Sequence, residues 1–548
     1  MKNEKVKKSG GKFWRNLLIG IAALIVLCIL INIFASQLLN NMVKEKVVSD
    51  VNSHKKTHLQ LEDVSYNIFT NTISITKPEL IIRDSTKAEN NLYNISAPLV
   101  KISGVNWFRL ILSSGFSANE LSVDDTNIKI NSEEGTEEDN EGRSDNQHLI
   151  NDSFIAKLPA RLNPFILDKL VINSGTLTGN IKSGKESITD SVQNFSLSIK
   201  DINLNPHVYD DSLKFIYADD LEFTASKISR KYLTAGNVLS IDSVSISGDK
   251  SNIELNNLSF KPFLSLGDYF LRKAYRSDRY IINLPVAKFD NVNFRQIFWN
   301  KIYEAGNITL NNFLVDILTD KRLPPNPSTN PKMPNDIMRR LDFQIDLKSI
   351  SLNNGNLFIK SLKPYSDAPA ELAFTDIQGN VSNICNIMRR KTDCSIEAAA
   401  DLAGAGRLKV NMDLPLLSES LNFKYNGSLG SMSLLPLNKW LEREELTRIK
   451  EGTIDSVAFS VDVKNGIALV KVTPLYHNLV IKLLDKDDWG EKTIPSFIAN
   501  IIKIKKSNPE DDKQPMTANV PYIKNKDDTF LDLVWNSLKK GLGNVVGF

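Results

Sequence analysis

The stretch FQIDLKSISL, residues 343–352, places apolar side chains at alternate positions over most of its length. A period of two sends successive side chains to opposite faces of a β-strand. Stretches with the same alternation recur between residues 72 and 463, and Asn, Gly and Asp separate them as turn residues. The pattern predicts a mainly β protein, in which an antiparallel sheet has one apolar and one solvated face.

The alternating positions supply the candidate residues of the apolar face. They are Ile73, Ile75, Leu121, Val123, Ile128, Ile130, Leu239, Ile241, Ile253, Leu255, Ile308, Leu310, Phe343, Ile345, Leu347, Leu421, Phe423, Tyr425, Phe459, Val461 and Val463. Such a face must close on itself, pack on another layer or bind an apolar molecule. Few helical segments are available to cover it. An elongated, lipid-lined β-groove and stacked β sandwiches are therefore the two alternatives.

An internal repeat extends this unit along the chain. APLVKISGVNW (97–107) aligns with LPVAKFDNVNF (284–294) at an offset of 187 residues, and ELSVDDTNIKI aligns with NITLNNFLVDI at the same offset. After a linker in each copy, LVINSGTL (170–177) matches ISLNNGNL (350–357) at an offset of 180. Repeated β units indicate an assembly that grows by adding strands.

The first 40 residues predict a membrane anchor. Residues 1–16 carry six Lys or Arg against one Glu, and Leu17 to Ala35 is an uncharged run of 19 residues. As a helix this run spans about 28 Å, close to the hydrocarbon thickness of a bilayer. The flanking positive charge predicts a cytoplasmic N-terminus, with the rest of the chain on the far side. A cleaved signal peptide is the alternative, but Ile33-Phe34-Ala35 is a poor cleavage site. Apolar residues at helical spacing continue to Val51, so the helix is expected to run past the membrane.

The domain boundaries follow from these features. We expect a basic tail (1–16), an anchor (17–39), a first β unit (40–245), a second β unit (246–430) and a C-terminal β segment (431–548). An acidic loop at 131–147 and a proline-rich loop at 323–336 interrupt the two units. Both have the composition of exposed linkers.

No motif of catalysis, metal binding or cofactor binding stands out. His54 and His58 have the i, i+4 spacing of a zinc pair, but they lack a third ligand and the glutamate of a metalloprotease. A net charge of +3 and the absence of a basic stripe with aromatic residues argue against nucleic acid as a partner. The chain is therefore predicted to be a non-enzymatic protein without a cofactor. Cys385 and Cys394 leave two alternatives open, a disulfide across a hairpin and two free thiols.

The C-terminus, TFLDLVWNSLKKGLGNVVGF (529–548), predicts an amphipathic helix. Its apolar face is expected to consist of Phe530, Leu531, Val534, Leu538, Leu542 and Val545. One interpretation is a helix that caps the last strand edge of the sheet. The other is a docking helix that meets a membrane or a partner.

Several of these segments resemble the AsmA-like envelope proteins. The similarity is carried by the anchor, by LEDVSYNIFTNTISITKPELIIRD, by LNKWLEREELTRIKEGTID, by FIANIIKIKKSNP and by the final helix. The resemblance implies a single-pass inner-membrane protein with a periplasmic β-groove. It also implies a role in phospholipid movement toward the outer membrane and in envelope integrity, with no catalytic residues. The expected partners are phospholipid, the inner membrane and outer-membrane or envelope proteins. A structural or assembly factor for envelope proteins is the alternative function.

Overall fold

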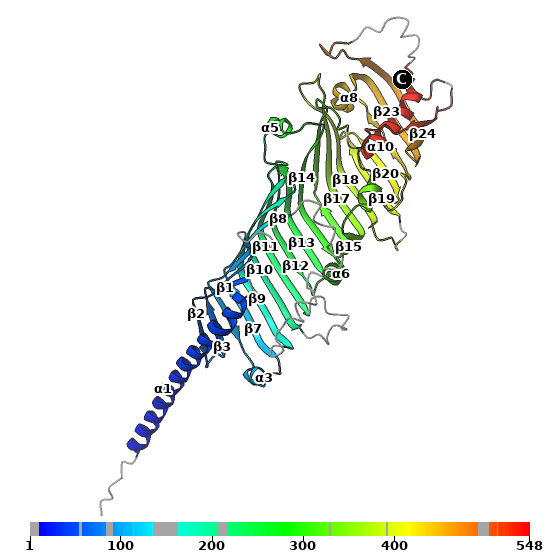
Figure 1. Ribbon diagram of the computed structural model, residues 1–548. Coiled ribbons are helices and arrows are strands. Elements are labelled where there is room, and N and C mark those ends of the chain that lie inside the picture. The colour runs from blue at the N-terminus through cyan, green and yellow to red at the C-terminus, as the bar shows by residue number, and fades with distance from the viewer. Residues whose placement is uncertain are drawn as a thin grey trace, which may run out of the picture. The chain divides into compact units, whose positions relative to one another are not determined.

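The computed structural model describes residues 10–53, 57–83, 91–112, 114–134, 163–204, 218–327, 330–388, 390, 393–491, 504–511 and 513–547. Strands hold 57% of the chain and helices 18%, which confirms the mainly β class. The described residues form one long apolar N-terminal helix, a mixed sheet of 25 strands, a few short helices and a C-terminal helix (Figure 1). The chain divides into two compact units, and the boundary between Ser226 and Lys227 falls within strand β11.

The first unit begins with the predicted anchor helix. Helix α1 (Gly10–Met42) continues through a π-helical segment (Val43–Val48) into α2 (Ser49–Ser53), as the apolar spacing beyond Ala35 predicts. The helix from Val26 onward is long and apolar enough to cross a membrane, by length and composition.

Short strands follow in pairs, with one short helix among them. They are β1 (Thr57–Gln60), β2 (Asp63–Asn67), β3 (Thr72–Thr76), β4 (Glu79–Arg83), β5 (Asn91–Ser96), β6 (Leu99–Ser103), α3 (Trp107–Ile111), β7 (Phe116–Asp124) and β8 (Thr126–Glu134). Three longer strands complete the order: β9 (Phe165–Ser183), β10 (Glu186–Leu204) and β11 (Asp220–Tyr232).

The second unit repeats the arrangement and extends it. Its first part comprises β12 (Asn237–Ser247), β13 (Asn252–Pro262), α5 (Leu266–Leu271), β14 (Asp278–Asp290), α6 (Phe294–Asn300), β15 (Ile302–Asn311), β16 (Leu314–Asp320), α7 (Pro334–Arg339) and β17 (Gln344–Leu362). Its second part comprises β18 (Ala370–Cys385), β19 (Cys394–Leu402), β20 (Gly406–Leu414), β21 (Phe423–Leu429), β22 (Met432–Ser433), the 3₁₀ turn Leu435–Leu437, α8 (Asn438–Glu445), β23 (Thr447–Lys464), β24 (Ile467–Leu483), β25 (Ala518–Ile523) and α10 (Phe530–Val546).

The sheet is mixed, whereas the sequence predicts antiparallel pairing throughout. Strands β7 and β8 both pair parallel with β9, and β15 and β16 both pair parallel with β17. The prediction is wrong at these ladders because the linkers are crossovers. About 30 residues separate β8 from β9, and a parallel pair needs a connection of a dozen residues or more. The acidic residues beyond Glu134 lie outside the described residues.

The parallel ladders also establish the repeat in three dimensions. In the first copy, each paired residue of β7 and β8 lies opposite the β9 residue that is 49 positions later in the sequence, as Leu121 lies opposite Leu170. In the second copy, the paired residues are 42 positions apart in the sequence, as Ile308 and Ile350 are. The difference of seven is the same as the difference between the sequence offsets of 187 and 180. The second copy therefore has the same pairing with a shorter crossover.

Many strands bend at one residue with a left-handed backbone. In the first unit these residues include Lys77 and Asp125, which separate β3 from β4 and β7 from β8. The positions in the second unit include Asn257, Asn312, Asn354 and Asp376, all with φ between 47° and 55°. The alternation of apolar residues moves from odd to even positions across Asp125: Leu121 and Val123 precede it, and Ile128 and Ile130 follow it. A left-handed residue interrupts the regular alternation of a strand, which accounts for the change.

Candidate functional site

The main feature of the second unit is an apolar row that crosses twelve strands without interruption. Each residue of this row is the cross-strand partner of the next, from β12 to β25. We call it the central apolar row: Ile246, Ile253, Phe289, Ile308, Ile350, Val381, Ile396, Met412, Tyr425, Val461, Val470 and Val520. Cross-strand partners lie about 4.5–5.5 Å apart on one face, so the row forms a continuous apolar surface.

A second row two positions along the strands has the same character. It consists of Val244, Leu255, Ala287, Leu310, Leu352, Gly379, Ala398, Val410, Gly427, Phe459, Val472 and Ala518. The two rows widen the apolar surface along the strands.

The row between them is polar at every strand. It consists of Ser245, Glu254, Lys288, Thr309, Ser351, Asn380, Glu397, Asn411, Asn426, Ser460, Lys471 and Asn519. Its side chains point to the opposite face because the strand period is two. Lys288 and Glu254 form an exposed ion pair of 3.5 Å there. The second unit therefore has one apolar and one polar face.

Burial changes along the central apolar row. From Ile246 to Ile396 the side chains are half-buried, except for Ile308, which is 5% exposed. From Met412 to Val470 they are buried, and Tyr425, Val461 and Val470 are at most 1% exposed. The apolar face is thus partly open to solvent at β12–β19 and fully covered at β20–β24.

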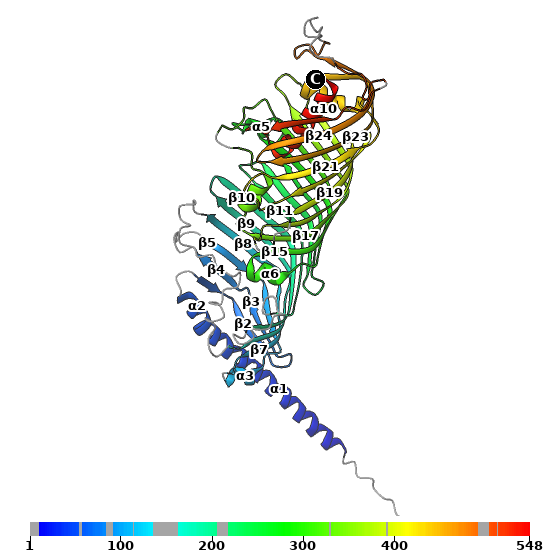
Figure 2. The ribbon, with the colours of Figure 1, turned by 90° about the vertical axis from the view of Figure 1, so that its right-hand side faces the viewer.

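Helix α10 covers the buried end. It packs against β24 and β25, and Figures 1 and 2 show it against the last strands of the unit. The buried residues of α10 are Leu533, Ser537, Gly541 and Val545. At Gly541 an added Cβ would lie 2.7 Å from Cγ1 of Val472, so glycine permits this close approach. The helix packs on the apolar face of the sheet over its last two strands, β24 and β25, where the sequence predicts a cap for the last strand edge.

A buried hydrogen bond attaches α10 to the row. The hydroxyl groups of Tyr425 and Ser537 lie 2.6 Å apart, and the Tyr425 hydroxyl also donates to the carbonyl oxygen of Val534 at 3.1 Å. Burial raises the pKa of Tyr425 to about 12, and the hydrogen bond with Ser537 opposes part of that rise. Tyr425 is neutral under ordinary conditions, and its polar atom has partners in an otherwise apolar layer.

The first unit contains two equivalent rows over β2, β3, β6, β7, β9 and β10. One consists of Val64, Ile75, Val100, Val123, Ile172 and Leu197. The other consists of Tyr66, Ile73, Ile102, Leu121, Leu170 and Ile199. Except for Val64, which is 1% exposed, the residues of these rows are half-buried. The same kind of apolar face is therefore present in both units.

The candidate residues predicted from the sequence fall into three groups. The first group lies in the paired rows: Ile73, Ile75, Leu121, Val123, Ile253, Leu255, Ile308, Leu310, Tyr425, Phe459 and Val461. The second group lies on strands beyond the bends or near strand ends: Ile128, Ile130, Leu239, Ile241, Ile345, Leu347, Phe423 and Val463. Phe343 and Leu421 form the third group, because they precede β17 and β21. Phe343 is 40% exposed.

Five of these candidates belong to a packed core. Phe423, Tyr425, Phe459, Val461 and Val463 are each at most 8% exposed and lie in one cluster with α10. They are covered by protein, so the partly open surface is formed by the earlier strands. Sequence reasoning missed several members of that surface, among them Phe289, Ile350, Val381 and Ile396. Ile350 stands in FQIDLKSISL, where the alternation changes phase after Leu347, and that change was the available signal.

The predicted face of α10 is mostly correct. Phe530, Val534, Leu538 and Leu542 pack against the core cluster, and Val545 is fully buried. Leu531 is 48% exposed and lies off the buried face, so its assignment was wrong. The small residues Ser537 and Gly541 take the central positions instead.

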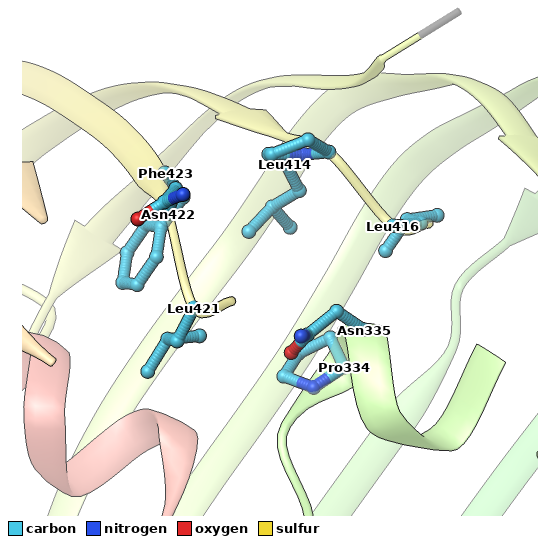
Figure 3. Close-up of a pocket in the computed structure, with 8 residues that line it drawn as sticks. Pro334, Asn335, Leu414, Leu416, Leu421, Asn422 and Phe423 are labelled. Atoms are coloured by element: carbon cyan, nitrogen blue, oxygen red, sulfur yellow. The ribbon is translucent and has the colours of Figure 1, made fainter. Parts of the chain in front are cut away.

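One pocket lies beside this core. It is lined by Pro334 and Asn335 of α7, by Leu414 at the end of β20, by Leu421 in the connection and by Phe423 at the start of β21 (Figure 3). The space measures about 210 Å³ with its part open to solvent. The pocket is therefore a small gap between α7 and the sheet.

The structure resolves the two cysteine alternatives in favour of free thiols. Cys385 lies opposite Asp346 and Cys394 lies opposite Leu414, and neither forms a disulfide. Burial raises the pKa of Cys394 to about 11, so its thiol stays protonated. His58 lies on strand β1, while His54 is outside the described residues. Among the described residues no group of three or more His, Cys, Asp or Glu could hold a metal ion.

Comparisons of the chain with protein-family models, curated proteins and solved structures find no match. The resemblance to the AsmA-like envelope proteins stays a prediction from the sequence.

Proposed function

We propose that this chain is a membrane-anchored lipid-binding protein that holds or moves phospholipid between the inner and outer membranes and supports envelope integrity. The observation that carries the proposal is the central apolar row, which is unbroken over twelve strands and, apart from the buried Ile308, half-buried from Ile246 to Ile396. A partly open apolar surface of this extent calls for an apolar occupant.

Acyl chains fit the chemistry of this surface. Both rows consist of aliphatic, aromatic and small residues, and the charged and amide side chains lie on the other face. Burying one methylene group contributes about 0.8 kcal/mol, so roughly ten methylenes on this surface would contribute on the order of 8 kcal/mol before ordering costs. A surface of this kind offers little to a polar substrate.

Helix α1 supports a membrane source for the lipid. Its described side chains from Val26 to Phe34 include many exposed apolar residues, and the helix is long enough to span a bilayer. The positively charged residues before its apolar run favour a cytoplasmic N-terminus. A periplasmic location for the sheet follows from this orientation and from the resemblance to envelope proteins.

The test uses two adjacent residues that face opposite sides. The photo-crosslinking amino acid p-benzoylphenylalanine is placed at Ile350, in the central apolar row, or at Ser351, in the polar row, of the full chain. After irradiation of intact cells, mass spectrometry identifies the adducts. We expect phospholipid adducts at position 350 and few at 351. An absence of lipid at 350, or equal lipid at both positions, would contradict the proposal.

A structural or assembly role is the second candidate. The observation that favours it is α10, which fills the end of the apolar face with protein. If the rest of the face binds envelope proteins, the adducts at position 350 will be proteins rather than lipids. The same experiment therefore separates the two functions.

A further inference from the structure

The end of the first unit beside α1 carries an unusual group of exposed apolar side chains. In the β2–β3 turn, Ile68 is 40% and Phe69 is 69% exposed. In and just after α3, Phe108 is 81%, Ile111 is 75% and Leu112 is 74% exposed. We call these five residues the apolar tip. Exposed large apolar side chains that gather in this way mark a contact surface.

Hydrogen bonds place the tip beside the predicted membrane span. The side-chain oxygen of Asn32 in α1 accepts from the backbone N–H of Ile68 at 2.9 Å. One turn further on, the Ser36 hydroxyl donates to the carbonyl oxygen of Tyr66 at 2.8 Å. Asn32 lies three residues inside the apolar run that ends at Ala35. At 1.5 Å per residue, the β2–β3 turn lies about 4–5 Å below the end of that run.

Further contacts connect α3 to the same place. The indole N–H of Trp107, the first residue of α3, lies 2.9 Å from the side-chain oxygen of Asn71 and 3.0 Å from the Tyr66 hydroxyl. The rings of Tyr66 and Trp107 meet edge to face at 5.2 Å. The amide of Asn71 donates to the carbonyl oxygen of Val105 at 3.1 Å. The turn and α3 are therefore held together, and Figures 1 and 2 show α3 at the α1 end of the unit.

The second copy of the repeat provides an internal comparison. Asn106 and Asn293 cap α3 and α6 in the same way, by accepting from the N–H three residues later. At the repeat offset of 187, Phe108 corresponds to Arg295. The β12–β13 turn is Gly248-Asp249-Lys250-Ser251, where the first copy has Ile68 and Phe69. Ile111 and Leu112 correspond to Phe298 and Trp299, which are half-buried, so among the described residues the exposed apolar tip occurs in the copy that is joined to α1.

We infer that the apolar tip inserts into the interfacial layer of the same membrane that α1 spans. The occupant is a lipid bilayer, because the tip is continuous with the anchor and its depth of about 4–5 Å is close to the lower end of the roughly 5–10 Å to which apolar faces are buried at membrane interfaces. The insertion gives the sheet a second attachment and fixes how the first unit meets the membrane. The inference rests on the proposed membrane anchor and does not require lipid transport.

The experiment measures depth in the membrane by spin labelling. The full chain with Cys28→Ser is reconstituted in vesicles of phosphatidylethanolamine and phosphatidylglycerol, and a nitroxide is attached at Phe69→Cys or Phe108→Cys. Cys385 and Cys394 are buried, and the chain without an added cysteine measures their background. Phe34→Cys in α1 is the positive control at 68% exposure, and Met388→Cys in the second unit is the aqueous control at 71%.

We expect the ratio of oxygen to nickel-chelate accessibility at positions 69 and 108 to approach that at position 34 and to exceed that at 388 several-fold. Phe108→Arg, which introduces the residue of the second copy, should lower the ratio at position 69. Ratios at 69 and 108 equal to that at 388 would overturn the inference, as would spin–spin broadening that shows a second copy at the tip. Failure at position 34 would instead overturn the anchor and the inference with it.

Discussion

At the scale of the residue, Gly541 decides how closely α10 approaches the apolar face. A Cβ at this position would lie 2.7 Å from Val472 and 2.9 Å from Val470, and both neighbours are fully buried. Gly541→Leu should therefore destabilise the C-terminal part by about 1–3 kcal/mol through overpacking. Lys540→Ala, at an exposed position of the same helix, should stay within about 0.5 kcal/mol of wild type. Denaturant titration followed by tryptophan fluorescence measures both. Equal stability of the two variants would contradict this account of the packing.

Tyr425 makes the stability of the same layer sensitive to alkaline pH. Its pKa of about 12 lies above the ordinary value of 10.0, so the folded state favours the neutral phenol. The unfolded state loses the proton first, and stability should therefore fall as pH rises from about 10 to 12. Tyr425→Phe should make this fall shallower and should cost about 1 kcal/mol at neutral pH, because the hydrogen bond to Ser537 is lost.

Thermal unfolding at a series of pH values measures this effect. Tyr303→Phe is the control, because Tyr303 is 48% exposed. It should leave the alkaline fall of stability unchanged. An identical fall in Tyr425→Phe and wild type would show that Tyr425 does not carry the effect.

At the scale of the element, the bends depend on single left-handed residues. Asn354 in β17 has φ of 54°, and its amide donates to the side-chain oxygen of Asn312 at 2.6 Å. Asn354→Val should cost about 1–2 kcal/mol, because a β-branched residue is disfavoured in this conformation. Asn354→Gly should cost less, since glycine accepts a positive φ. Asn356→Val is the matched control two residues away at an ordinary φ, and it should be tolerated. Melting temperatures rank the three variants, and equal losses would contradict the role of the bend.

The sequence identifies strands and faces better than it identifies strand partners. Alternation around Leu121 and Ile308 predicts which side chains are apolar, and both residues lie in the paired rows. The period of two contains no information on the direction of the neighbouring strand, so the parallel ladders to β9 and β17 were missed. The two repeat offsets, 187 and 180, nevertheless differ by seven. Paired residues in the two parallel ladders, which are 49 and 42 positions apart, differ by the same number. In α10, a search for large apolar residues misses Ser537 and Gly541, because close approach requires small ones.

The packing of α10 also gives an expectation for its deletion. Removing residues 529–548 would uncover Tyr425, Val461 and Val470, which are at most 1% exposed in the intact chain. We expect aggregation or rapid proteolysis of the truncated protein, since a large apolar patch would be exposed. Limited proteolysis compares it with Lys539→Ala, which removes only a surface ion pair of 2.8 Å with Glu445. A stable, lipid-loaded truncated protein would favour the docking helix instead.

At the scale of the whole molecule, the two units carry the same apolar face but end differently. The first unit includes the predicted anchor helix α1 and the apolar tip, and the second adds β18–β25 and α10. Apart from Ile308, the central apolar row is half-buried before Met412, and it is buried from Met412 to Val470. A ligand that enters along the open strands would therefore meet a covered end at α10. The proposed lipid binding is compatible with the packed core on one sheet, because the open surface and the core lie on different strands.

This division predicts that a charge in the open part of the row abolishes binding without unfolding the protein. Ile350→Asp places a carboxylate on the half-buried apolar surface, where an acyl chain would have to desolvate it. Phospholipid recovered with the full chain after gentle extraction should fall several-fold, while the melting temperature changes little. Ser351→Asp puts the same charge on the polar face, and its lipid content should match wild type. Val461→Asp, in the buried part of the row, should unfold the C-terminal region. If Ile350→Asp retains its lipid, or if it unfolds as Val461→Asp does, the open part of the row is not the lipid-binding surface.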